Sequence, residues 1–162
     1  MIYNEQVINS IKDILIERNE SIAVAESVTA GHLQAALSAA MDASKFFQGG
    51  ITTYNLGQKA RHLHIDPILG ENKNCVDRQI AETMAIEVAK MFSSNYGIGI
   101  TGYASKVPEG EGGLFAFYCI VHDGHVRKLE RLTATEKLPF DVQVDYANQV
   151  VQSLLQLLTE RE

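Results

Sequence analysis

The chain has 162 residues, of which 46% are hydrophobic and 21% charged, and its 14 basic and 20 acidic side chains give a formal net charge of −6. This length and composition suit a single domain, over residues 1–162, that buries enough surface to fold without disulfides or metal ions. An acidic chain with dispersed cations is not expected to bind nucleic acid through its phosphates.

The sequence also predicts a cytoplasmic protein that does not enter a membrane. The first 20 residues carry acids from Glu5 onward and lack the apolar core of a signal peptide. No apolar run approaches the roughly 18 residues that cross a bilayer. Cys75 and Cys119 form no Cys-x-x-Cys pair, and they fit a reducing compartment as small apolar side chains.

Hydrophobic periodicity predicts helices and strands in alternation along the first half of the chain. The expected elements are a helix over Gln6–Arg18, a buried strand over Ile22–Ala25, a helix over His32–Met41, a strand over Phe46–Tyr54, and a short helical or irregular piece over Gln58–His64 that ends near Pro67. A polar loop is expected over Gly70–Asn74.

The second half begins with Asp77, a good N-cap for a helix. The expected elements are a helix over Arg78–Ser93, a strand over Tyr96–Thr101, a loop over Gly102–Gly113, a strand over Leu114–His122, a hairpin turn at Asp123-Gly124, a strand over Val126–Leu132, and a helix from Pro139 to about Leu158. Strands with helices between them predict a three-layer α/β/α sandwich, in which the hairpin supplies an antiparallel strand.

Ser27 is a candidate nucleophile, because it follows a buried strand and precedes a helix. Amides at a helix N-terminus can point at an oxyanion that forms beside such a serine. From position alone, the commoner role is an N-cap or ST-turn hydroxyl. The surrounding run AESVTAG also differs from the Gly-x-Ser-x-Gly elbow of serine hydrolases.

A serine nucleophile needs a base, and Lys59 qualifies if burial lowers the pKa of its amine. Tyr54 can relay the proton or orient the lysine. The alternatives are that Lys59 is an ordinary surface charge and Tyr54 an ordinary aromatic side chain of a strand. His62 and His64 are two residues apart and do not share a helical face, so no metal site is expected.

The glycine-rich run GIGITGYASKVPEGEGG, residues 97–113, follows a strand, where α/β proteins bind ligands. It lacks the spacing of a Walker loop or a dinucleotide fingerprint. An ordinary strand-exit loop is therefore the alternative.

Three blocks, Ala25–Gly31, Gly49–Lys59 and Thr101–Lys106, resemble in order and spacing three blocks of the C-terminal domain of the competence/damage-inducible protein CinA, the family of nicotinamide-nucleotide amidases. The resemblance implies a mixed, mostly parallel five-stranded sheet. It also implies hydrolysis of nicotinamide mononucleotide to its nicotinic-acid form and ammonia, without a cofactor or metal, by a homodimer or other homo-oligomer.

By the same resemblance, Ser27 attacks the carboxamide carbon, and Lys59 and Tyr54 handle the proton. The residues implied in substrate binding or oxyanion stabilisation are Glu26, Thr29, Ala30, Gly31, Gly50, Thr101, Gly102 and Ala104.

The chain departs from the family pattern in two segments that the resemblance associates with ligand binding. The Gly-Pro of the third block is Ser105-Lys106 here, and the stretch from Thr133 to Gln143 lacks the family's arginines. These changes suit a substrate without the 5′-phosphate, a replacement cation at Lys106 or Lys137, or a non-catalytic nucleotide-binding or assembly domain.

Overall fold

A computed structural model of the chain describes residues 2–160; residues 1 and 161–162 of the expected domain lie outside them. The elements in chain order are α1 (Glu5–Arg18), β1 (Ile22–Glu26), α2 (His32–Ser38), β2 (Phe47–Thr52), α3 (Leu56–Leu63), α4 (Pro67–Asn72), α5 (Arg78–Met91), β3 (Tyr96–Gly102), β4 (Phe115–His122), β5 (His125–Thr133) and α6 (Pro139–Glu160). None of the helices within residues 2–160 is long and apolar enough to span a membrane.

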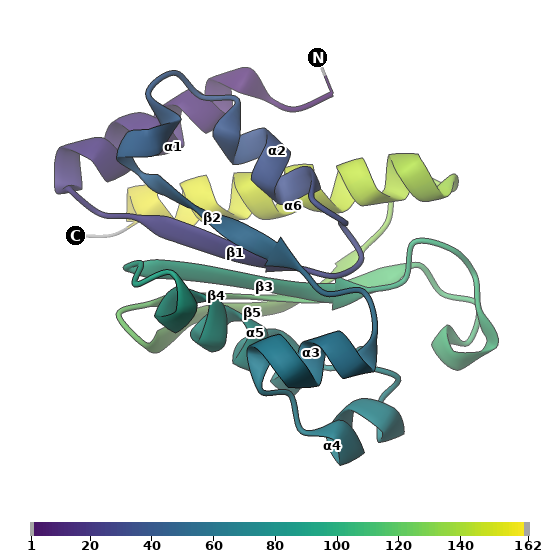
Figure 1. Cartoon of the computed structure of the whole chain (residues 1–162). Coiled ribbons are helices and arrows are strands. Elements are labelled where there is room, and N and C mark those ends of the chain that lie inside the picture. Colours follow the sequence, from purple (N-terminus) through teal and green to yellow (C-terminus); the bar gives the residue numbers. More distant parts are fainter. Residues whose placement is uncertain (1, 161–162) are drawn as a thin grey trace.

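The five strands form one mixed sheet in the order β2-β1-β3-β4-β5. The pairs β1–β2 and β1–β3 are parallel, and the pairs β3–β4 and β4–β5 are antiparallel, so that β4 alone among these strands runs against the others. Helices α1, α2 and α6 cover one face of the sheet, and α3, α4 and α5 cover the other (Figure 1). This arrangement confirms the three-layer α/β/α fold.

Alternation along β1 and β3 divides the core between the two faces of the sheet. Ile22 and Val24 pack with α1, α2 and α6, whereas Ala23 and Ala25 face the α5 side. In β3, Gly97 and Gly99 lie so close to α5 that an added Cβ would stand 2.2 and 2.4 Å from backbone oxygens of that helix. The glycines of the run YGIGIT therefore let α5 pack closely against the sheet. This packing accounts for both glycines, so a bound ligand is not needed to explain them.

Two expectations about the first half were wrong. The predicted loop at Gly70–Asn74 is largely helix α4, which begins because Asp66 accepts a hydrogen bond from the Ile68 amide and Pro67 occupies the first turn. The helix expected to reach Met41 ends at Ser38 instead, since its last turn tightens into i→i+3 bonds at Ala39 and Ala40.

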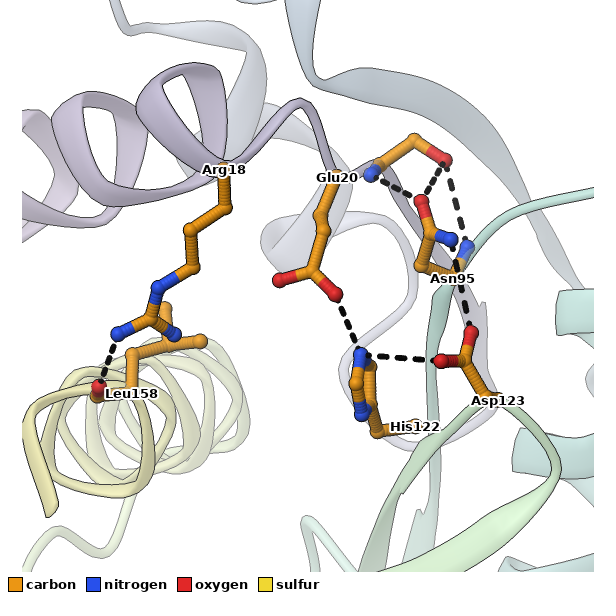
Figure 2. Close-up of polar contacts among 7 residues, drawn as sticks. Arg18, Glu20, Asn95, His122, Asp123 and Leu158 are labelled. Carbon is orange, nitrogen blue, oxygen red and sulfur yellow. Dashed lines mark hydrogen bonds and ion pairs between the residues drawn. The ribbon is translucent and has the colours of Figure 1, made fainter. Parts of the chain in front are cut away.

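A polar cluster ties the amino ends of β1 and β3 to the β4–β5 turn (Figure 2). His122 lies against the carboxylates of Glu20 and Asp123 and stacks on the Tyr96 ring. Asn95 accepts a hydrogen bond from the Ser21 amide at 2.8 Å and donates to Asp123. These contacts hold three chain segments together at the end of the sheet that lies opposite the site described next.

Candidate active site

A cavity of about 550 Å³ opens at the carboxyl edge of the sheet, beyond the ends of β1 and β3. Ser27 and Lys59 both line it, and the Lys59 amine donates a hydrogen bond of 2.8 Å to Ser27 Oγ. The two residues are 32 positions apart in the chain, and the fold brings them together from the β1–α2 turn and from α3. A serine and a lysine in direct contact have the geometry that a nucleophile and its base require.

The turn after β1 fixes the position of Ser27. The Ser27 amide donates to the carbonyl of Ile100 at 3.1 Å, which extends the pairing of β1 with β3 by one residue. The Ser27 carbonyl then accepts from the Ala30 amide at 3.0 Å, and Ala30 and Gly31 both take positive φ, at 47° and 104°. This sharp reversal keeps the serine side chain at the edge of the sheet while the chain turns into α2.

Glu26 has a different place from the one expected. Its side chain is fully buried, and its two carboxylate oxygens accept hydrogen bonds from the amides of Leu33 and Gln34, at 2.8 and 2.9 Å, and from the Thr29 hydroxyl. A carboxylate in this position satisfies the free amides of α2 and neutralises its positive end. The first amides of α2 are therefore engaged by the protein itself and do not face a ligand.

Lys59 is 2% exposed although it carries an amine. Its amine donates to Ser27 Oγ and, at 3.1 Å, to the carbonyl of Thr53. Burial lowers the pKa of the Lys59 amine from its ordinary value, and the nearby Cys75 thiol partly opposes that shift. A lowered pKa gives the amine a free lone pair at lower pH than an exposed lysine, as a general base requires.

Cys75 is a residue of this cavity that sequence reasoning missed. It lines the cavity close to Lys59, and burial raises the pKa of its thiol. The Thr101 hydroxyl donates to the Cys75 carbonyl at 2.5 Å, so the expected site residue Thr101 holds this segment against β3. A cysteine at φ 60° after a polar stretch has no sequence pattern that could have identified it.

The remaining expected residues divide between the cavity and its surroundings. Those that line the cavity are Tyr54, Thr101, Gly102 and Ala104; those that do not are Glu26, Thr29, Ala30, Gly31 and Gly50. Gly50 packs against β1 and Gln34, where a Cβ would stand 2.5 Å from the Val24 carbonyl. Lys106 and Lys137 do not line the cavity either, and a replacement cation at either position stays a prediction.

Tyr54 lies at the mouth of the cavity and is 65% exposed. Its hydroxyl forms no hydrogen bond to any of residues 2–160, so a part for Tyr54 in moving the proton stays a prediction. Val28, which was not expected, is buried and lines the cavity directly after the serine.

The molecule is thus a three-layer α/β domain with a buried serine–lysine pair in a cavity at the carboxyl edge of its sheet. Residues 4–159 match the model of the CinA C-terminal domain, and the chain belongs to that family.

Curated relatives and solved structures agree with this assignment. The chain is 34% identical over 110 residues to a CinA-like protein of Picosynechococcus and 38% identical over 102 residues to one of Synechocystis. These alignments cover 68% and 62% of this chain but 26% and 24% of the relatives, so the chain spans about a quarter of their length.

The fold matches that of the competence damage-inducible protein A from Klebsiella pneumoniae with a TM-score of 0.91 at 19% identity, over 99% of each chain. It matches a CinA superfamily protein from Escherichia coli with a TM-score of 0.85 at 22% identity, over 96% of this chain and 90% of that one. At these identities the likeness shows a shared fold.

Proposed function

We propose that this domain is an amidohydrolase that cleaves the carboxamide of a pyridine nucleotide or a closely related pyridinium compound, the reaction that converts nicotinamide mononucleotide to its nicotinic-acid form. The observation that carries the proposal is the 2.8 Å contact between the Lys59 amine and Ser27 Oγ inside a cavity large enough for such a ligand. Membership of the CinA C-terminal domain family supports it.

In the first half-reaction, Ser27 Oγ attacks the carboxamide carbon while its proton passes to the neutral Lys59 amine. The tetrahedral adduct collapses as Lys59 returns that proton to the departing nitrogen, so the C–N bond breaks and ammonia leaves. The substrate remains as an ester on Ser27. In the second half-reaction, water attacks the ester, Lys59 takes the water's proton and hands it to Ser27 Oγ, and the carboxylic acid is released.

The negative oxygen of the tetrahedral adduct needs a hydrogen-bond donor that is already in place. The Val28 amide suits this role, because it follows the nucleophile directly and has no hydrogen-bond partner within residues 2–160, while Val28 lines the cavity. The amide after the nucleophile takes the same part in α/β-hydrolases. We assign Tyr54, at the mouth of the cavity, to contact with the substrate, where its hydroxyl can also carry a proton.

Ammonia release from nicotinamide mononucleotide and from its unphosphorylated riboside, measured with the wild type and with Ser27→Ala, tests the proposal. We expect release by the wild type and its loss in the variant. Ser38→Ala is the matched control, since Ser38 is exposed on α2. If the wild type binds these compounds by calorimetry yet releases no ammonia, the domain is a binding domain and the proposed function is wrong.

A further inference from the structure

The cavity around Ser27 is poor in cations. Lys59 is already engaged with Ser27 and Thr53, and no other lysine or arginine of residues 2–160 lines the cavity. Two acids, Glu71 and Glu109, line it and are exposed at its mouth. The ligand that enters therefore meets negative charge before it reaches the serine.

The adjoining hollow of about 580 Å³ continues this pattern. It shares Glu71 and Glu109 with the first cavity and adds a third acid, Glu111, against a single lysine, Lys73. Lys106 lies on the same loop as Glu109 but is exposed and lines neither cavity. The residues that line the two cavities thus carry more negative than positive charge.

Helix N-termini, the usual alternative for holding a phosphate, are capped by side chains at this edge. Glu26 occupies the amides of α2, Asn55 accepts from the Gln58 amide at the start of α3 at 3.0 Å, and Asp77 accepts from the Gln79 amide at the start of α5 at 3.0 Å. Two of these three caps are carboxylates, which repel a second anion. No arginine among residues 2–160 lines the cavity, and carboxylates cap two of the three helix ends at this edge.

We propose that the cavity prefers a cationic pyridinium carboxamide that carries no phosphate over the phosphorylated form of the same compound. This inference rests on the proposed function and specifies its substrate. Glu71 and Glu109 attract the positive ring, and the aromatic residues Tyr54 and Tyr103, which line the cavity, suit a cation as well. Selectivity between the two forms then comes from repulsion of the phosphate, because both carry the same ring.

Two compounds that differ by one group make the test. Nicotinamide riboside and nicotinamide mononucleotide share the pyridinium carboxamide and differ in the 5′-phosphate. We expect kcat/KM of the wild type to favour the riboside by about tenfold or more, since like charges that meet in a binding site weaken binding by at least that factor. Glu109→Lys should shift the ratio toward the mononucleotide. Glu17→Lys makes the same change in net charge on the exposed surface of α1 and should leave the ratio unchanged.

Binding to the Ser27→Ala variant separates this inference from the proposed function. Calorimetric titration measures the affinity of this variant for each of the two compounds. The ratio of the affinities gives the phosphate preference whether or not the wild type hydrolyses either compound. Tighter binding of the riboside supports the inference even if no ammonia is released. Equal or tighter binding of the mononucleotide, or a ratio that Glu109→Lys and Glu17→Lys change alike, overturns it.

Discussion

Replacing Lys59 by methionine removes the amine and keeps a side chain of similar length. The amine lies 2.8 Å from Ser27 Oγ, so the variant loses the group that takes the serine proton. A positioned general base contributes about 100- to 10,000-fold to a rate, which corresponds to roughly 3–5 kcal/mol of transition-state stabilisation. We expect kcat/KM for ammonia release to fall by a factor in that range.

The same substitution should change the free energy of unfolding little. It removes a hydrogen bond to the Thr53 carbonyl and leaves that oxygen without its donor, at a cost of about 1–2 kcal/mol. It also removes the cost of burying an amine, and it adds apolar packing in a site that is 2% exposed. Because these effects oppose each other, the melting temperature should stay within about 4 °C of the wild type.

The pH dependence gives a second measurement on this pair. Because the pKa of Lys59 lies below its ordinary value of 10.5 in the folded protein, the wild-type kcat/KM should rise with pH at a midpoint below 10.5. The unfolded chain binds the proton of the Lys59 amine more tightly than the folded protein does. The stability of the wild type relative to Lys59→Met should therefore rise with pH between the folded pKa and 10.5, and this gain is lost as pH falls through the folded pKa.

Lys45→Met, at an exposed lysine that pairs with Asp42, is the control and should match the wild type in activity. Activity of Lys59→Met within about threefold of the wild type, or the same rising limb in its pH profile, would contradict the role of Lys59 as the general base.

Three further changes test the fold around the site by thermal unfolding. Ala30→Gly relieves an alanine at φ 47° and should stabilise by about 1 kcal/mol; no gain means that the turn is unstrained. Gly99→Ala places a Cβ 2.4 Å from the Ala81 carbonyl and should cost about 3 kcal/mol; a cost no larger than that of Gly57→Ala, where the Cβ meets ordinary contact, contradicts this. His122→Ala breaks the contact with Glu20 and should cost about 2 kcal/mol; an unchanged melting temperature means that the cluster carries no stability.

Elements with a strong periodic pattern or a clear end signal could be predicted from the sequence. Asp77 does cap α5 as expected, and the hairpin at Asp123-Gly124 joins β4 to β5. Helix α4 could have been predicted in the same way, because Asp66-Pro67 is a helix-start pair. The polar residues after it were interpreted as a loop because its six residues are too few to show periodicity.

The contacts within the candidate site could not be predicted from local sequence pattern. Proximity of Ser27 and Lys59 is a property of the fold. The sequence alone offered Lys59 only as a possible base, beside a surface charge, and resemblance to a family favoured the first role. The role of Glu26 was not visible, because its carboxylate caps amides seven and eight residues further along, beyond the reach of the usual capping box. The charge of the cavity depends on Glu71 and Glu109, which come from α4 and from the loop after β3.

In the proposed reaction, Ser27 carries the substrate as an ester. Acid-quenching the wild type during turnover of nicotinamide riboside, followed by peptide mass measurement, tests it most directly, with ammonia release by Ser27→Ala measured beside it. We predict a mass increase equal to the substrate less ammonia on the peptide that contains Ser27, and no ammonia release by the variant. An adduct on another residue, or undiminished ammonia release by Ser27→Ala, would contradict the claim.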